Sequence, residues 1–186
     1  MDPAFPAPRR DHLQAPPELA ERGIALRWLD ADDGGWLRAL YADTRAQELA
    51  PLAWPDAARQ AFVDQQFALQ HRHFVSTCGG AEFLAACRGS TPLGRMYLER
   101  AAPVHRLLDI ALFARARGHG IGSALIAAAQ RDAAACGASL RLHVLAHNPD
   151  ARRLYARLGF RPAGEAAPYL RMEWRDPARA GVAGLS

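Results

Sequence analysis

The sequence predicts a mixed domain of helices and strands, of the α/β or α+β class, and three observations lead to this prediction. Residues 81–89, 91–101 and 104–114 are apolar segments joined by short turns, a pattern typical of successive strands. Residues 115–174 then alternate between helical and strand-like periods, as strand–helix–strand units do. The chain has 186 residues, of which 50% are hydrophobic, enough to bury one sizeable core. We therefore expect one domain over residues 23–175.

The two ends of the chain differ from this domain in composition. Residues 1–22 are rich in proline and charge, so we expect a disordered leader there, and residues 176–186 are expected to form a flexible tail. The leader lacks the apolar core of a secretory signal, and no stretch approaches the roughly 18 apolar residues of a membrane span. Cys78, Cys87 and Cys136 share no metal-type spacing, which predicts free thiols. These features indicate a cytoplasmic protein with neither a metal site nor a membrane partner.

The charged residues exclude some kinds of chemistry. All 23 residues counted as lysine or arginine are arginines, so a P-loop lysine and a Schiff-base lysine are ruled out. The formal net charge of +4 permits an anionic ligand. Because the arginines are scattered, with no run longer than two, we expect no nucleic-acid partner.

The first part of the domain is expected to hold one strand and two helices. Residues 23–30 have the composition of a strand, and the turn "DADDGG" after them can cap a helix that starts near Trp36. A second helix begins at Pro55 and Asp56, residue types suited to a helix start. Its apolar residues are expected to cover an edge of the sheet: Phe62, Phe67, Leu69 and Phe74.

The strand over residues 104–114 is expected to be central and largely covered, because alternation places apolar side chains on both of its faces. One face is expected to hold Val104, Arg106, Leu108, Ile110 and Leu112. The other face is expected to hold Leu107, Asp109, Ala111 and Phe113.

The second part of the domain is expected to alternate helix, strand, helix and two strands. A helix runs to about Ala135 and a strand covers residues 139–146. The next helix has Asn148 as its N-cap and Pro149 at its first position, and it is closed by Gly159. Two closing strands surround "AGEAAP". The buried stripe of the first of these helices is Ile121, Ala124, Leu125 and Ala128.

Three glycines at alternate positions, Gly118, Gly120 and Gly122, stand directly before that first helix. The first turn of a helix presents backbone N–H groups without partners and a partial positive charge, and glycine lets such amides converge on an anion. This favours a bound diphosphate, to which Arg115 and Arg117 can add charge-assisted bonds. The alternative is a tight turn with no ligand. The spacing is not G-x-G-x-x-G and no acidic residue follows about twenty positions on, which disfavours NAD.

Two motifs resemble those of one enzyme superfamily. "RGHGIG", residues 117–122, fits the pattern [Q/R]-x-x-G-x-[G/A], and "NPDARRLYARLGF", residues 148–160, is similar to N-x-x-A-x-x-L-Y-x-x-x-G-F. Both are typical of the GNAT superfamily of acetyl-CoA-dependent N-acetyltransferases, here in a poorly characterised bacterial branch. The resemblance covers residues 104–174; the part before it agrees only in element order. It implies the GNAT fold, a mixed sheet of six or seven strands that is splayed between strands 4 and 5 and flanked by about four helices.

The resemblance implies that acetyl-CoA lies in the splayed cleft as a co-substrate, with no metal. The backbone of the fourth strand would bond the pantetheine, the amides of the glycine loop would take the pyrophosphate, and the asparagine that caps the last helix would bond the pantetheine arm. The residues expected to bind the cofactor are Ile110, Ala111, Leu112, Arg117, Gly118, His119, Gly120, Ile121, Gly122, Ser123, Asn148 and Tyr155.

Tyr155 and His143 are the expected catalytic residues. The superfamily uses the tyrosine at the position of Tyr155 as a general acid, which would protonate the CoA thiolate; the alternative is a core tyrosine on an apolar stripe. His143 could deprotonate the amine through water, because imidazole titrates near the working pH. The alternative is a histidine that contacts the substrate without taking a proton.

Other polar residues are weaker candidates. Asp109 and Glu99 are further carboxylates that could transfer a proton. The alternative for Asp109 is a structural hydrogen-bond acceptor, and the alternative for Glu99 is a solvent-exposed residue at the end of a strand. His71 and His73 would line the acceptor side or face solvent. Each remaining charged candidate could bind a ligand or be an ordinary surface charge. The ligand would be the adenosine phosphate for Arg152 and Arg153, and a cationic amine for Glu48, Asp32 and Asp33.

The expected function is N-acetyl transfer from acetyl-CoA to a primary amine, on a small molecule or a peptide. We expect direct transfer in a ternary complex, because none of the three cysteines falls in a nucleophile motif. The alternative is a module of the same fold that binds CoA or a metabolite without turnover. A homodimer is possible for this fold.

Overall fold

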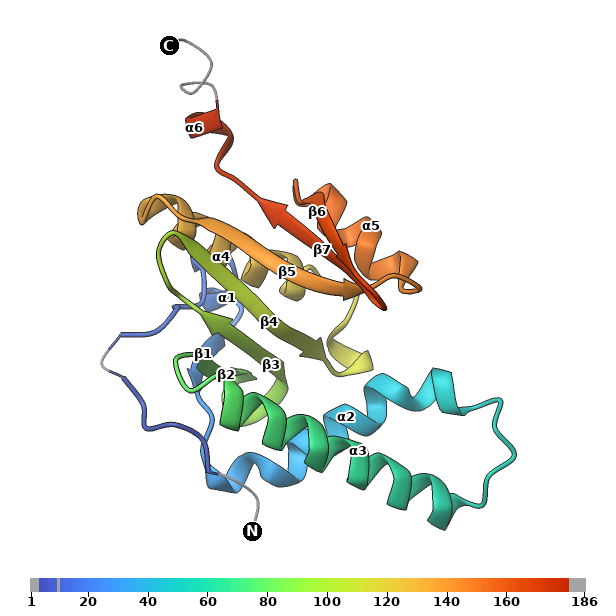
Figure 1. Ribbon diagram of the computed structural model, residues 1–186. Helices are drawn as coiled ribbons and strands as arrows, with labels where there is room; N and C mark the ends of the chain where they lie inside the picture. Colours follow the sequence, from blue (N-terminus) through green and yellow to red (C-terminus); the bar gives the residue numbers. More distant parts are fainter. Residues whose placement is uncertain (1–3, 10, 181–186) are drawn as a thin grey trace.

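The centre of the molecule is a seven-stranded mixed sheet (Figure 1). This computed structural model describes residues 4–9 and 11–180. The strands lie in the order β1-β2-β3-β4-β5-β7-β6, and every neighbouring pair is antiparallel except β4 and β5, which are parallel. Their bounds are β1 Ile24–Trp28, β2 Glu82–Arg88, β3 Thr91–Glu99, β4 Val104–Leu112, β5 Ser139–Leu145, β6 Arg161–Ala166 and β7 Tyr169–Trp174. The predicted mixed sheet is confirmed.

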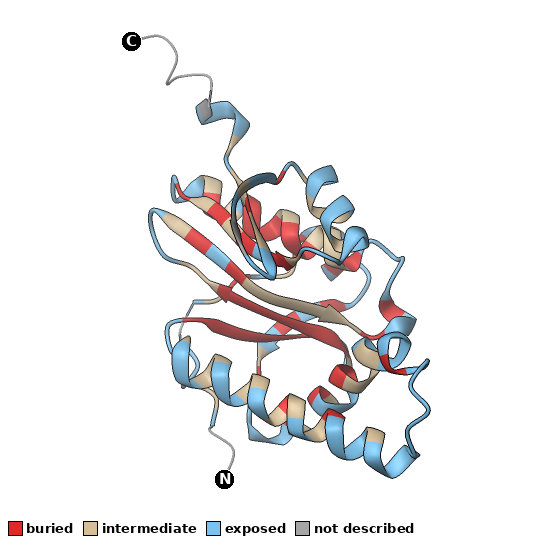
Figure 2. Cartoon of the chain, turned by 45° about the vertical axis from the view of Figure 1, so that its right-hand side comes forward, coloured by how far each residue is buried: buried red, intermediate tan, exposed pale blue. Residues whose placement is uncertain are grey.

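Helices cover both faces of the sheet, and each face has its own apolar core. The first core joins the sheet to α1, α4 and α5, and the second joins it to α2 and α3. Figure 2 shows buried residues concentrated along the central strands. The bounds are α1 Pro17–Ala20, α2 Gly34–Leu49, α3 Asp56–Thr77, α4 Ile121–Ala135, α5 Pro149–Arg157 and α6 Pro177–Ala180. Among the described residues, no helix is long and apolar enough to cross a membrane.

The two helices that follow the sequence motifs begin as their residue types predict. Gly120 caps α4 in a left-handed conformation with φ of 76°. At the start of α5, the side chain of Asn148 accepts a hydrogen bond from the N–H of Ala151 at 3.1 Å, and Pro149 occupies the first helical position. Gly159 follows α5 with φ of 84° and ends it. The start of each helix is therefore determined by neighbouring residues in the sequence. In chain order, α4 precedes β5 and α5 follows it.

Helix α3 covers a face of the sheet rather than an edge. Phe67 is buried in the second core and Phe74 packs against it, but Phe62 and Leu69 are exposed. The expectation that all four face the sheet is wrong for Phe62 and Leu69. The stripe of α3 that faces the sheet is formed by Val63, Phe67 and Phe74, and Phe62 and Leu69 lie outside this stripe.

Strand β4 contains an irregularity that the alternation pattern misses. The register between β3 and β4 shifts by one residue, as in a β-bulge. Leu107, Ile110 and Leu112 consequently contact the first core, whereas Leu108 contacts the second. The prediction that Leu108 shares a face with Ile110 and Leu112 is therefore wrong. Leu108 and Asp109 both point towards the α2–α3 side, where Asp109 meets a side chain of β3.

The parallel strands β4 and β5 separate after a short stretch of pairing. Their ladder runs from Val104 opposite Ser139 to Leu107 opposite Leu142, although both strands continue beyond it. Leu108 to Leu112 and His143 to Leu145 therefore lie on strands that diverge. The expected splay between strands 4 and 5 is present, and it leaves the facing backbone edge of β4 without a neighbouring strand.

The expectation of a disordered leader fails for its second half. Leu13 and Leu19 are 5% and 0% exposed and belong to the first core. Residues 17–20 form α1, which packs against β1 and α4. In its first half, Phe5 packs against the second core. Residues 177–180 of the expected tail form α6. Residues 1–3, 10 and 181–186 lie outside the described residues.

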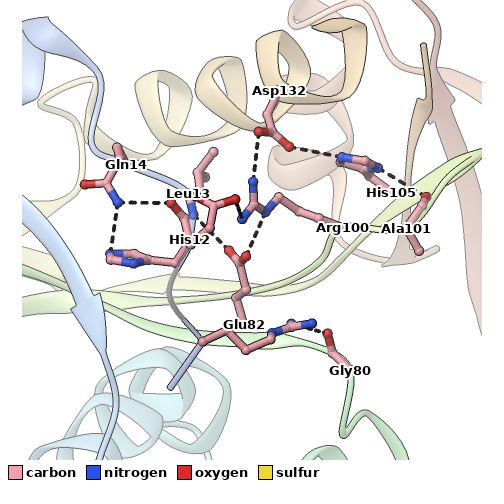
Figure 3. A network of polar contacts seen from close by, with 11 residues as sticks. His12, Leu13, Gln14, Gly80, Glu82, Arg100, Ala101, His105 and Asp132 are labelled. Carbon is pink, nitrogen blue, oxygen red and sulfur yellow. Dashed lines mark hydrogen bonds and ion pairs between the residues drawn. The ribbon is translucent and has the colours of Figure 1, made fainter. Parts of the chain in front are cut away.

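A polar network fastens this N-terminal segment to the sheet (Figure 3). The Arg100 guanidinium binds Glu82 at 2.7 Å, Asp132 of α4 at 3.1 Å and Asp11 at 2.9 Å. The N–H of Leu13 donates to the other oxygen of Glu82 at 3.0 Å. Because the Glu82 side chain is almost fully buried, its charge depends on these partners. The segment is therefore held by burial and by charge together.

Candidate functional site

A cleft of about 440 Å³ opens where β4 and β5 diverge. It lies between the carboxyl end of β4, the first turn of α4 and helix α5, and α2 and α3 close its other side. Seven of the residues expected to bind the cofactor line it: Ile110, Ala111, Leu112, Arg117, Gly122, Asn148 and Tyr155. The glycine loop and α5, which are distant in sequence from each other, are thus brought to one cavity.

The other expected cofactor residues form the loop and first helical turn beside the cleft. Gly118 and Gly120 both have φ of 76°, which other residues rarely adopt. No atom lies within 4 Å of a Cβ built on either one, so backbone conformation rather than crowding requires glycine. Within the described part of the chain, no acceptor is found for the amides of residues 118–123. These N–H groups at the positive end of a 15-residue helix can therefore receive an anion.

The two arginines expected to flank the phosphate have other partners. Arg117 forms an ion pair with Asp43 of α2 at 2.9 Å and donates to the carbonyl of Leu112 at 2.8 Å. Arg115 donates to the carbonyl of Pro92 and stacks on the ring of Phe113 at 4.1 Å. Arg117 thus joins the glycine loop to α2 and β4, while Arg115 is directed away from the cleft.

Tyr155 of α5 lies in the cleft with the properties of a proton donor. Its ring packs against Phe160 with centroids 5.7 Å apart, which fixes the side chain on α5. Burial raises the pKa of Tyr155 to about 12, and the negative charge of Asp109 adds to this effect. The hydroxyl is therefore protonated at neutral pH. Asn148, at the start of α5, uses its side-chain oxygen for the helix cap and still lines the cleft.

Asp109 shares this cleft and is held by a buried arginine. Arg95 of β3, which is 4% exposed, donates from Nε to Oδ2 of Asp109 at 2.7 Å. It also donates to the side-chain oxygen of Gln70 on α3 at 2.6 Å. No partner for the other oxygen of Asp109 is found among the described residues. Sequence reasoning missed Arg95 and Gln70; a charged residue inside an apolar strand was the one available signal for Arg95.

His143 does not line the cleft that contains Tyr155. It lies in an adjoining pocket of about 510 Å³ between α3, β4, β5 and β7. The pKa of His143 is lowered by burial and then by the positive charges of Arg171, Arg141 and Arg106. The imidazole is therefore neutral at pH 7 and can accept a proton, but from the side of this second pocket.

The weaker candidates are distributed over several places. His73 lines the adjoining pocket, whereas His71 is stacked on Phe67 with ring centroids 5.8 Å apart. Arg152 and Arg153 line neither of these two cavities. The acidic candidates are in ion pairs, except Asp32, which is exposed: Glu99 with Arg106, Glu48 with Arg45, and the buried Asp33 with Arg27.

One cluster in the described part of the chain has metal-ligand chemistry. His105, Asp132 and Cys136 place a nitrogen, an oxygen and a sulfur within 4.8 Å of one another. His105 Nε2 lies 3.0 Å from Asp132, whose other oxygen binds Arg100, so hydrogen bonds and an ion pair account for the arrangement (Figure 3). The cluster lies outside the cleft. That the protein uses no metal stays a prediction.

Residues 36–160 match the profile of the acetyltransferase (GNAT) family. The chain belongs to this family of acetyltransferases. The match takes in α2 and α3 as well as the glycine loop and α5, so the similarity extends well beyond the two motifs. No curated protein is similar enough in sequence to this GNAT to count as a match.

Several solved structures have the same fold as this GNAT. PaiA N-acetyltransferase from Thermoplasma acidophilum, solved in complex with coenzyme A, is 20% identical; the likeness covers 82% of this chain and 99% of that one, with a TM-score of 0.64. An acetyltransferase from Thermus thermophilus is 18% identical, with 82% and 97% covered and a TM-score of 0.60. A GCN5-related N-acetyltransferase from Rhodopseudomonas palustris is 18% identical, with 82% and 95% covered and a TM-score of 0.58. These likenesses confirm the predicted GNAT fold.

Proposed function

We propose that this GNAT transfers the acetyl group of acetyl-CoA directly to a primary amine in a ternary complex. The observation that carries the proposal is the meeting of three features in one cleft. The strands β4 and β5 diverge there, the unpartnered amides of residues 118–123 border it, and the protonated Tyr155 hydroxyl lies within it. A tight turn without a ligand would explain the glycines but not the other two features.

The residues of the cleft fit the parts of a CoA molecule. The amides of residues 118–123 suit a pyrophosphate, since they combine free donors with the positive end of α4. The edge of β4 from Ile110 to Leu112 lacks a β5 partner and can bond an extended pantetheine, although the carbonyl of Leu112 is already bound by Arg117. Asn148 borders the same path. When bound, acetyl-CoA supplies an activated thioester.

The transfer forms an N–C bond, breaks a C–S bond and moves two protons. Tyr155 is proposed to donate its hydroxyl proton to the departing sulfur, for which a raised pKa keeps the proton in place. The amine must give its proton to a base. Asp109 is the first candidate, because it shares the cleft with Tyr155 and one of its oxygens has no partner among the described residues. His143 is the second candidate and would act through water from the adjoining pocket.

Direct transfer is supported by the positions of the cysteines. Cys87 is buried, Cys136 lies at the end of α4, and Cys78 borders the adjoining pocket, so none of them lines the cleft. An acetyl-cysteine intermediate therefore lacks a placed nucleophile. All three thiols are free, which also supports the proposed cytoplasmic location.

The proposal is tested by incubating the protein with acetyl-CoA and a panel of primary amines. We expect free CoA thiol and N-acetylated product in equal amounts, and no acetyl group on the protein by intact mass. Binding of acetyl-CoA without product from any amine would instead support a binding module. A stable acetyl group on Cys78 during turnover would contradict direct transfer.

A further inference from the structure

A second cavity adjoins the cleft, and its walls are basic. It has a volume of about 510 Å³ and is lined by the side chains of Arg106, Arg141, His143 and His73, together with apolar residues of α3 and β4. Among the described residues that line it, none is acidic. We call it the basic pocket.

The basic pocket lies next to the reacting end of the cleft. Gln70 of α3 lines both cavities, and the irregular step in β4 places Leu108 in the basic pocket and Asp109 in the cleft. A molecule in the basic pocket can therefore extend a group past Gln70 to the neighbourhood of Asp109 and Tyr155. Gln70 thus forms a boundary that the two cavities share.

The basic pocket lies on the face of the sheet away from α4. Leu140, Leu142 and Val144 of β5 pack in the first core with α4. Because side chains alternate along a strand, Arg141 and His143 point to the opposite face. A phosphate bound at the start of α4 would thus occupy the other side of the sheet, and the basic pocket stays open to a second substrate.

We propose that the amine acceptor of this GNAT carries an anionic group, a carboxylate or a phosphate, which binds in the basic pocket through Arg141 and Arg106. This inference rests on the proposed function and names the class of acceptor that the same site takes. The acceptor amine is placed at the cleft end beside the carboxylate of Asp109, and its anionic group is placed at the basic end. A polyamine fits such a site poorly, because its second ammonium would meet guanidinium groups.

The ion pairs around the basic pocket leave positive charge in excess. Arg141 binds Glu173 at 2.9 Å, and the other oxygen of Glu173 binds Arg175 at 2.9 Å. Arg106 pairs with Glu99. Arg171, whose charge also reaches His143, donates only to a backbone carbonyl at 3.1 Å in the described structure.

Three guanidiniums thus share two carboxylates and the fourth, that of Arg171, binds neither, and three of the four act on His143. The lowered pKa of His143 agrees with this excess of positive charge. A bound anion would balance this excess of positive charge. Arg141 contacts Glu173 through Nε and one Nη, so its other Nη can donate to a further acceptor.

The test compares amines that differ in one charged group. L-phenylalanine is paired with 2-phenylethylamine, 3-aminopropylphosphonate with propylamine, and the other standard amino acids that have a primary amine and a single carboxylate with their decarboxylated amines. Spermidine represents polyamines. Acetylation of each amine is measured as kcat/KM. We expect at least one amine that carries an anionic group to exceed its partner without that group tenfold or more, and spermidine to be a poor acceptor.

Two variants with opposite expectations locate the effect. Arg141→Gln removes a guanidinium that lines the basic pocket, whereas Arg175→Gln removes the other guanidinium on the same glutamate but lies outside the pocket. We expect Arg141→Gln to abolish the preference for the anionic amine, mainly through a tenfold or larger rise in KM, and Arg175→Gln to retain it. Arg106→Gln, at an exposed position, gives the same readout if Arg141→Gln fails to fold.

The outcomes separate the inference from the proposed function. Preferred acetylation of the amines without an anionic group, or of spermidine, would overturn the inference and leave the N-acetyltransferase in place. A preference for anionic amines that survives in both Arg141→Gln and Arg106→Gln would also overturn it. Failure of acetyl-CoA to raise the melting temperature, with no amine acetylated, would overturn both.

Discussion

Replacement of Gly120 by alanine separates the loop's structural role from its ligand. The loop reaches the start of α4 through φ of 76° at this position, and a Cβ there would meet no protein atom within 4 Å. Alanine can keep this conformation only with strain, so we expect the loop to relax and its amides to stop converging. The variant should therefore lose stability modestly and lose affinity for acetyl-CoA.

Gly89, in the turn between β2 and β3, provides a matched control. It has φ of 55° and equally open space around its Cβ position, but it lies outside the cleft. Left-handed backbone costs a non-glycine residue about 1–2 kcal/mol. For a protein of this size, 1 kcal/mol corresponds to about 2–4 °C. We expect Gly120→Ala and Gly89→Ala each to lower the melting temperature of the free protein by about 2–8 °C.

The two variants should differ once acetyl-CoA is added. At a concentration a hundred times the wild-type Kd, the ligand stabilises the folded state by about 2.7 kcal/mol, or about 5–11 °C. Gly89→Ala should show this full rise. A tenfold loss of affinity in Gly120→Ala halves the stabilisation to about 1.4 kcal/mol. Differential scanning fluorimetry across a range of acetyl-CoA concentrations measures both effects. A full rise in Gly120→Ala would refute the phosphate cradle.

Three further predictions follow from the described contacts. Arg100→Ala should lower the free energy of unfolding by about 3 kcal/mol in urea titrations, because it leaves the buried Glu82 without its guanidinium; an unchanged midpoint would show that the network is not structural. Tyr155→Phe should lower kcat about a hundredfold or more and leave the acetyl-CoA Kd nearly unchanged; a large loss of affinity at unchanged kcat would make the tyrosine structural. Because Tyr155 has a pKa of about 12 and must be protonated to act, activity should not fall between pH 7 and 10. If His143 is the base, activity should rise with pH through its lowered pKa, below 6.5, and His143→Asn should remove that rise; a rise that persists in His143→Asn would rule out His143 as the base.

Features that depend on a few neighbouring residues were predictable from the sequence. The start of α4 after alternate glycines, the start of α5 at Asn148 and the seven strands each have a local cause in backbone preference or side-chain period. The cleft between the glycine loop and α5 was also expected, because a known family pairs the two motifs. Residues with such local causes lie where the sequence placed them.

Features that depend on distant partners were not predictable. The bulge in β4 reverses the alternation that placed Leu108 beside Ile110, and it arises from register with β3. His143 occupies a separate pocket because the strands diverge before it. Arg117 turns to Asp43, more than seventy positions away, and Arg100 holds a leader whose composition suggested disorder. Each of these depends on a charge or a packing partner that no local pattern reveals.

Hydrogen–deuterium exchange with and without acetyl-CoA tests the central claim most directly, since that claim places CoA in the splay between β4 and β5. In the free protein, the amides of residues 118–123 should exchange quickly, because they have no acceptor among the described residues. Addition of acetyl-CoA should slow exchange there and along Ile110 to Leu112. Binding of acetyl-CoA that leaves both segments unchanged, or protects a different part of the sheet, would contradict the account.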